Sequence, residues 1–390
     1  MSDMRFIDCI DFSGSTTSSF TGSRMYLSTG ALKGNVIANE VLQEVTFSSR
    51  PSRANLDVDI GDIIFAKMQG TNKVLTITEE TKNLIISTGF FVVRPKDGYD
   101  PEFIYQYINS REFNLQKDKF CSGATQKAIN NDGLQNITIP EIDINQQNKI
   151  GRALEISRNN LLYRREQISV LNKLQSDTFA DMFYSDAAYP EIPLEKACDE
   201  IYRYPTFYGF EYQDTGIPVI KIGNITLDGM VDDDLENYDF ITKEINDRFP
   251  RTYIKMYDSL MAVRGDGSTA KRIGIVISDN LVGANISPNL LRLSANADIC
   301  APAYLYFFLM SRDGQGKLEQ HITRTAKKTI TATNIKAIGM PLPPLPDQLH
   351  FQDIVLNIED QKARLYTSLK EMETIYKSLL QKAFYGELFQ

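Results

Sequence analysis

The sequence predicts an α/β (α+β) protein in which two globular domains in tandem repeat are separated by two long antiparallel helices that form a coiled coil. Three observations lead to this prediction. The chain repeats at a constant offset of 201 positions, so that Gln147 in the first copy matches Gln348 in the second. Each copy ends in a proline stop, and a helical pattern follows each stop. With 390 residues the chain also exceeds one ordinary hydrophobic core.

The first part of each copy reads as a mixed α/β unit. The stretch "PEFIYQYINSRE" (Pro101 to Glu112) answers "PAYLYFFLMSRD" (Pro302 to Asp313), and both predict a helix with proline in its first turn. Further upstream, "GDIIFAKM" (Gly61 to Met68) resembles "YDSLMAVR" (Tyr257 to Arg264), which predicts a short strand after an acidic turn. We therefore expect two copies of one domain.

A proline stop separates each unit from a long helix, in "TIPEIDINQQNKIGRAL" (Thr138 to Leu154) and in "GMPLPPLPDQLHFQDIVLN" (Gly339 to Asn357). Proline neither donates to a strand ladder nor sits inside a helix, so it ends the globular unit. Beyond each stop, apolar residues alternate spacings of four and three, which is typical of a coiled-coil seam. The residues that we expect to pair the helices are Leu154, Leu161, Ile168 and Leu171 in the first helix and Val355, Leu365, Leu369 and Met372 in the second.

The first seam is more polar than the second, because Ser157, Arg164, Gln175 and Thr178 occupy some of its positions. Polar seam residues weaken self-association and favour one specific partner helix. Two helices of matching length and register in one chain most simply pair antiparallel. That arrangement relates the two copies by a pseudo-twofold axis.

Composition excludes several functional classes. The formal net charge of -8 argues against a nucleic-acid partner if charge is counted globally, but basic residues gather locally, as in "RFPRTYIK" (Arg248 to Lys255). Four scattered cysteines and two histidines support neither a zinc site, nor a disulfide framework, nor histidine-dependent catalysis. No apolar run approaches the length of a membrane span and no signal peptide opens the chain, so we expect a cytoplasmic protein without a membrane partner.

The motifs of an enzyme of this size are missing. The stretch "GDGSTAKR" (Gly265 to Arg272) differs from a phosphate-binding loop, because Ala270 stands where a glycine should precede the lysine, and it reads as a hairpin tip. "NISPN" (Asn285 to Asn289) lacks the second proline and the aromatic residue of an amino-methyltransferase motif. We expect no cofactor, and no catalytic or metal-binding residues.

Three blocks carry a family resemblance: "GATQKAINNDGLQNITIP" (Gly123 to Pro140), "PLPPLPDQ" (Pro341 to Gln348) and "KSLLQKAFYGELF" (Lys377 to Phe389). Together with the repeat and the heptads, they resemble the specificity subunit of type I restriction-modification systems across essentially the whole chain. The N-terminal domain matches less closely before Gly61, since it lacks the aromatic-rich opening that the second copy has at "YPEIPLEKACDEI" (Tyr189 to Ile201).

The resemblance implies a non-catalytic subunit whose two target-recognition domains, Met1 to Asp143 and Asp186 to Pro344, each read one half of a split site on double-stranded DNA. It further implies that the helical regions, Ile144 to Ser185 and Leu345 to Gln390, set the spacer between the half-sites. These regions would bind two modification (methyltransferase) subunits, and restriction/translocase subunits would join through the complex.

Donor-rich loops supply the candidate DNA-contacting residues. Arginine and lysine can address guanine, and glutamine adenine, through the major groove, although a phosphate contact or a solvated surface position explains any single residue equally well. The candidates are Lys67, Gln69, Thr125, Gln126 and Lys127 in the first copy and Arg264, Lys271, Arg272, Arg324, Lys327 and Lys328 in the second.

Two other functions remain open on the residues alone. A coiled-coil protein-interaction scaffold without a DNA role would fit the acidic charge and the heptads. A methyltransferase or nuclease in its own right is disfavoured by the missing motifs.

Overall fold

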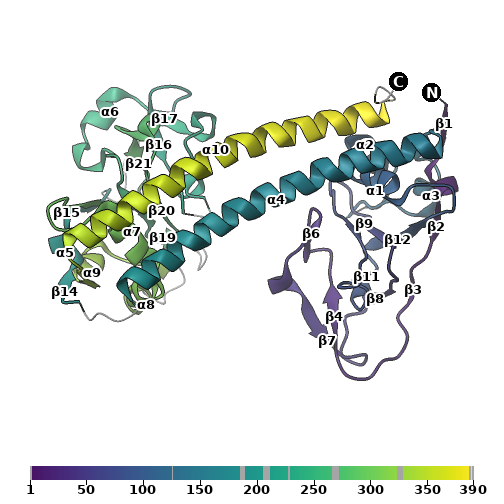
Figure 1. Cartoon of the computed structure of the whole chain (residues 1–390), viewed down its shortest axis with the longest axis horizontal. Helices are drawn as coiled ribbons and strands as arrows, with labels where there is room; N and C mark the ends of the chain where they lie inside the picture. The colour runs from purple at the N-terminus through teal and green to yellow at the C-terminus, as the bar shows by residue number, and fades with distance from the viewer. Residues whose placement is uncertain are drawn as a thin grey trace. The chain divides into compact units, whose positions relative to one another are not determined.

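The computed structural model describes residues 2–124, 126–184, 189–204, 211–226, 229–265, 272–322, 328–385 and 388; the side chains of residues 264, 265 and 328 are not among those described. The chain divides into two compact units (Figure 1). Unit 1 comprises Met1–Arg165 and Thr367–Gln390, and unit 2 comprises Glu166–Tyr366. Each unit therefore holds part of both long helices.

Unit 1 contains two main sheets. A four-stranded antiparallel sheet has the order β10-β9-β12-β2, and a five-stranded sheet has the order β3-β8-β11-β4-β7, in which β11 and β4 run parallel. Two short ladders, β1-β13 and β5-β6, complete the described part of the unit. The strands are β1 (Asp3–Arg5), β2 (Ile10–Phe12), β3 (Ser15–Thr16), β4 (Arg24–Leu27), β5 (Leu32–Lys33), β6 (Val36–Ile37), β7 (Gln43–Val45), β8 (Ala54–Asp57), β9 (Ile63–Ala66), β10 (Val74–Thr76), β11 (Ile85–Ser87), β12 (Phe90–Pro95) and β13 (Thr138–Pro140).

The helices of unit 1 cover the four-stranded sheet, with α1 packed against β10 and β12. Pro101 occupies the first turn of α1, and the Asp100 carboxylate accepts a hydrogen bond from the Phe103 N–H at 2.7 Å, which caps the helix. Besides α4, the helices are α1 (Pro101–Asn109), α2 (Arg111–Lys119), α3 (Asn131–Leu134) and the 3-10 helices η1 (Phe6–Cys9) and η2 (Asn39–Val41).

Unit 2 repeats this topology. Its four-stranded antiparallel sheet β20-β18-β22-β15 corresponds to β10-β9-β12-β2, and its sheet β17-β16-β21, with β16 and β21 parallel, corresponds to β7-β4-β11. The strands are β14 (Glu191–Pro193), β15 (Cys198–Arg203), β16 (Ile217–Ile220), β17 (Asp239–Ile241), β18 (Ser259–Ala262), β19 (Arg264–Gly265), β20 (Ile273–Ile275), β21 (Asn285–Ile286), β22 (Leu290–Ala295), β23 (Lys328–Thr329) and β24 (Gly339–Pro341).

The helices of unit 2 show the repeat most clearly. α7 and α8 begin and end 201 residues after α1 and α2, which confirms the predicted tandem repeat. Besides α10, the helices are α5 (Leu194–Ala197), α6 (Lys243–Asp247), α7 (Pro302–Met310), α8 (Arg312–Gln320), α9 (Ala332–Lys336), η3 (Ile222–Asn224), η4 (Leu235–Asn237), η5 (Pro250–Thr252) and η6 (Asp279–Leu281).

The long helices are α4 (Ile144–Phe183) and α10 (Leu345–Phe384), each of 40 residues. In unit 2 they run antiparallel, because Phe179 and Phe183 of α4 contact Phe351, while Gln175, one turn earlier, reaches Glu359 further along α10. None of the helices in the described part of the chain is long and apolar enough to cross a membrane.

One buried glutamine in each copy explains how the proline stop joins the long helix. The Gln147 side chain donates to the Ile142 carbonyl at 2.7 Å and accepts from the Asp100 N–H at 3.1 Å. Gln348 does the same with the Pro343 carbonyl at 2.7 Å and the Ala301 N–H at 3.0 Å. Each glutamine thereby satisfies backbone groups that the proline segment and the first turn of α1 or α7 leave open.

The turn before the central strand is also repeated, with one difference. Asp62 and Asp258 each accept a backbone N–H bond from three residues upstream, at 2.8 and 2.7 Å. The residue before each aspartate has a left-handed backbone, with φ of 86° at Gly61 and 66° at Tyr257. Glycine adopts this conformation freely, whereas a tyrosine there is strained.

Candidate nucleic-acid interface

In unit 1 the residues that follow β9 pair with a loop further along the chain, and we call this feature the unit 1 platform (residues 67–70, 121–124 and 126–130). Met68 and Ser122 both form antiparallel bridges with Ala128. The N–H of Gln69 donates to the Lys127 carbonyl at 2.9 Å, and that of Ile129 donates to the Lys67 carbonyl at 2.9 Å. Two residue groups about 60 positions apart in sequence are thus held together by backbone bonds.

The side chains of the unit 1 platform differ in their solvent exposure and in their hydrogen bonds to the rest of the unit. Gln69, Gln126 and Lys127 are exposed, and the Gln69 amide makes one long bond, at 3.3 Å, to the Asp118 carbonyl. Lys67 is half-buried: its ammonium donates to the Thr88 carbonyl at 3.1 Å and lies 4.5 Å from the centre of the Phe91 ring. Burial lowers the pKa of that ammonium. Thr125 lies outside the described residues.

Unit 2 builds the same feature, the unit 2 platform (residues 263–265 and 328–330). β19 pairs with β23, which places Arg264 opposite Thr329 and Gly265 opposite Lys328. The N–H of Ile330 donates to the Val263 carbonyl at 3.2 Å, as that of Ile129 does to Lys67. Of the other candidates predicted in this copy, Lys271, Arg324 and Lys327 lie outside the described residues.

Arg272 plays a different part in the structure from the platform residues. Its guanidinium donates to the carbonyls of Ile222 and Ile225, at 3.4 and 3.3 Å, and so ties the β18–β20 hairpin to the segment after β16. Lys73, which follows the β9–β10 turn, donates to the Thr29 carbonyl after β4 at 2.6 Å. The backbone carbonyl of Lys73 accepts a hydrogen bond from the Ala66 N–H, and that of Arg272 accepts one from the Ala262 N–H. Ala66 and Ala262 are equivalent in the repeat, so Lys73 and Arg272 occupy equivalent positions.

Sequence reasoning missed both Lys73 and Met68. The signal that could have found them is the match of "GDIIFAKM" with "YDSLMAVR", which sets Met68 beside Arg264 and, continued past the turn, Lys73 beside Arg272.

The residues predicted to pair the helices fall into two groups. Leu154, Leu161, Ile168 and Val355 are buried. Leu171, Leu365, Leu369 and Met372 are half-buried. Leu154 belongs to the core of unit 1 with Phe384, and Val355 belongs to the core of unit 2 with Phe351, so these seam residues also anchor the helices to the globules.

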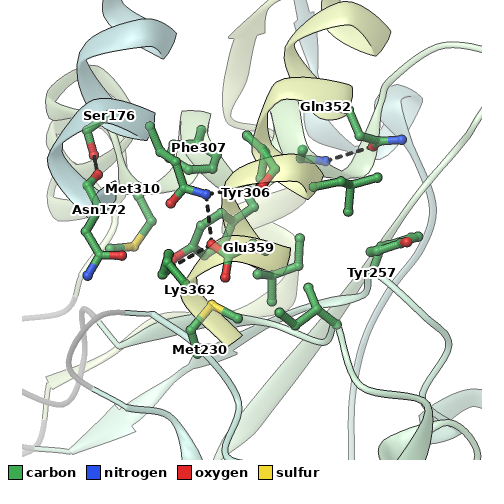
Figure 2. Close-up of a pocket in the computed structure, with 16 residues that line it drawn as sticks. Asn172, Ser176, Met230, Tyr257, Tyr306, Phe307, Met310, Gln352, Glu359 and Lys362 are labelled. Atoms are coloured by element: carbon green, nitrogen blue, oxygen red, sulfur yellow. Dashed lines mark hydrogen bonds and ion pairs between the residues drawn. The ribbon is translucent and has the colours of Figure 1, made fainter. Parts of the chain in front are cut away.

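Unit 2 contains a buried polar cluster at the seam (Figure 2). Lys362 is 1% exposed, and its ammonium lies 2.7 Å from the Glu359 carboxylate. Gln175 of α4 donates to the same carboxylate at 2.8 Å. The cluster borders a cavity of about 170 Å³ that is also lined by Tyr306 and Phe307 of α7.

Two kinds of reactive group can be compared with the sequence expectations, namely metal ligands and thiols. No group of three or more His, Cys, Asp or Glu side chains in the described part of the chain could hold a metal ion. The cysteines are free thiols, and burial raises the pKa of Cys9 to about 11 and that of Cys300 to about 12. Such thiols stay protonated at neutral pH and act as small buried apolar groups.

Comparison with known proteins agrees with the repeated geometry. The model of the type I restriction modification DNA specificity domain matches residues 19–172 and 202–371, once in each copy. The EcoBI specificity subunit of Escherichia coli is 31% identical over 180 residues, which span 44% of this chain and 36% of that relative. The match therefore covers about a third of the relative's length.

Two solved structures share the fold. A type I restriction-modification S subunit from M. genitalium aligns over 98% of this chain and 96% of its own, with a TM-score of 0.57 and 14% identity. A chain from a study of assembly and conformational transition of the type I restriction-modification system aligns over 99% and 98%, with a TM-score of 0.53 and 18% identity. Nothing in these matches supports a coiled-coil scaffold without a DNA role. The chain belongs to the family of type I restriction-modification DNA specificity domains, of which it carries two copies.

Proposed function

We propose that this chain is the non-catalytic DNA-recognition subunit of a type I restriction-modification complex, and that each globular domain reads one half of a bipartite site. In this proposal residues 1–143 and 186–344 are the recognition domains, and the unit 1 and unit 2 platforms are their reading surfaces. The observation that carries it is the repetition of the platform: the same strand end holds the same loop in both units, whereas the residues on it differ.

The exposed hydrogen-bond donors on the platforms support the recognition of base edges by side chains. Gln69, Gln126 and Lys127 stand on a backbone that four hydrogen bonds hold in place, so their side chains meet a ligand without reordering the chain. Arg264 and Lys328 lie on the paired strands of the second platform. Lys67 and Arg272, whose charged groups already bind carbonyls, act in this proposal as positioning residues.

The helical regions, 144–185 and 345–390, set the spacer and dock the modification subunits, two per chain, through which the restriction subunits join. Affinity for DNA phosphates requires clustered cations, and this chain has a net charge of -8. In this proposal the modification subunits therefore supply many of the phosphate contacts. We therefore expect weak DNA binding by the chain alone and tight binding in the complex.

Domain exchange tests the two-reader proposal. The chain is assembled with its modification subunits, and the methylated motif is mapped by sequencing. Replacing residues 186–344 by the equivalent part of a relative should change one half of the motif and leave the other half and the spacer intact. A change in both halves, or no sequence preference in the parent complex, would overturn the proposal.

Insertion into both long helices tests the spacer role. Four residues after Leu161 and four after the equivalent Lys362 lengthen each helix by about 6 Å, roughly the rise of two base pairs. Four residues nearly complete a turn, so the seam stays in contact. We expect unchanged half-sites and a spacer longer by one or two base pairs. Two-residue insertions, which rotate the seam by about half a turn, should instead abolish assembly.

A further inference from the structure

Met68 stands out on the unit 1 platform because it is apolar and exposed. The four residues before Lys67, which form β9, are all buried, whereas Met68 is 39% exposed. It pairs with Ala128 on the platform, and the next backbone bond joins Gln69 to Lys127.

The backbone fixes which way Met68 projects. Successive side chains of an extended strand point to opposite faces, and the Lys67 ammonium is turned toward the Thr88 carbonyl and the Phe91 ring. The Met68 carbonyl accepts from the Thr71 hydroxyl at 2.6 Å, which holds the turn that follows. Met68 therefore projects on the face opposite Lys67.

The internal repeat places a different chemistry at the same position of the other unit. Met68 opposes Ala128 in unit 1, and Arg264 opposes Thr329 in unit 2. A position that carries an arginine on one platform and a methionine on the other is suited to discriminate between base pairs. Its backbone role, the bridge to the loop, is the same in both.

Resting on the proposed function, we infer that Met68 is a specificity-determining residue that reads the 5-methyl group of a thymine in the first half-site. In the major groove the thymine methyl is the apolar group that base edges present; the other features are hydrogen-bond donors and acceptors. A flexible thioether adapts its shape to such an apolar target.

Uracil substitution tests this inference, because uracil differs from thymine only by the missing methyl. The full chain is assembled with its modification subunits, the half-site read by residues 1–143 is identified by domain exchange, and each thymine in it is replaced in turn. We expect uracil at one position of the half-site to weaken binding about fourfold, which corresponds to the free energy of removing one methyl group from water. The Met68→Ala variant should bind the thymine and uracil duplexes equally well.

Met25→Ala is the matched control, since Met25 on β4 is 38% exposed and lies outside the platform. That variant should keep the fourfold sensitivity to uracil. A first half-site without an A·T pair, no uracil effect at any position, or an effect that survives in Met68→Ala would overturn the inference while leaving the two-reader proposal intact. Loss of all sequence preference in the parent complex would overturn both.

Discussion

In unit 1, Arg158 of α4 lies 3.3 Å from the Glu102 carboxylate of α1 and 4.9 Å from the centre of the Tyr105 ring. In unit 2 the positions of the half-buried Arg158 and Glu102 are held by Glu359 and Ala303, and the cation at this place is the fully buried Lys362. The two places where a long helix packs on the first globular helix therefore share one backbone and differ in their charges.

The polar residues around these charges also differ between the two units. Tyr376 of α10 donates to the Gln106 side chain at 2.6 Å in unit 1. The equivalent residues in unit 2 are Gln175, which binds Glu359, and Phe307, which lines the cavity. Each unit pairs the cation at this place with its own acidic residue, and the pairing matters most for the buried Lys362. The two copies of the repeat can therefore carry different charged and polar residues at this place, provided that the residues contacting them differ as well.

The largest effect should follow from breaking the buried pair of unit 2. The Glu359→Ala variant leaves the Lys362 ammonium buried without its carboxylate, and we expect a loss of about 3–5 kcal/mol in the free energy of unfolding. Urea denaturation of the full chain measures it. Equal stability of variant and parent would show that Lys362 finds another partner or water.

Replacing the pair should be far better tolerated than breaking it. The double variant Glu359→Gln with Lys362→Leu keeps an amide for Gln175 and installs the residue type found at Leu161 in unit 1. We expect the free energy of unfolding of the double variant to equal that of the parent or to exceed it by up to about 4 kcal/mol. Apolar replacements of buried ion pairs are often neutral or stabilising. A double variant as unstable as Glu359→Ala would contradict this account.

A smaller effect is expected at the left-handed turn that the two units fill differently. Gly61→Ala places a Cβ at a φ of 86°, although no other heavy atom lies within 4 Å of that Cβ, so the cost comes from the backbone alone. We expect a loss of about 1–2 kcal/mol. Gly223→Ala, which also meets no atom within 4 Å and has no left-handed φ, is the control and should change stability less.

The smallest effect concerns the tyrosine that is special to unit 1. Tyr376→Phe removes the bond to Gln106 and should cost about 1 kcal/mol at neutral pH. Burial raises the pKa of Tyr376 to about 12, above its ordinary value of 10. Its protonated form therefore contributes stability that is fully present below pH 10 and is lost between about pH 10 and 12. The parent should lose more stability than Tyr376→Phe across that window, measured by denaturation at each pH.

Local, periodic features of this protein were determined by its sequence alone. The 201-residue repeat, the proline stops and the two long helices follow from short-range patterns. α4 begins four residues after Pro140, and α10 begins at Leu345 with Pro346 in its first turn, where a proline is tolerated. The family resemblance rests on the same blocks and was confirmed by the family match. Lys362 stands seven residues after Val355 and three before Leu365, so its spacing also places it in the seam.

Tertiary structure decided what each polar residue is for. Lys67 and Arg272 are predicted to contact DNA, and their charged groups bind carbonyls that lie 21 and 47 to 50 residues away in sequence, which the sequence alone does not indicate. The partners of Lys362 and the bridge that exposes Met68 depend on pairings between distant segments. A sequence pattern reports which face of an element is apolar, whereas the partner of a buried charge is set by whichever distant segment the fold brings within about 3 Å of it.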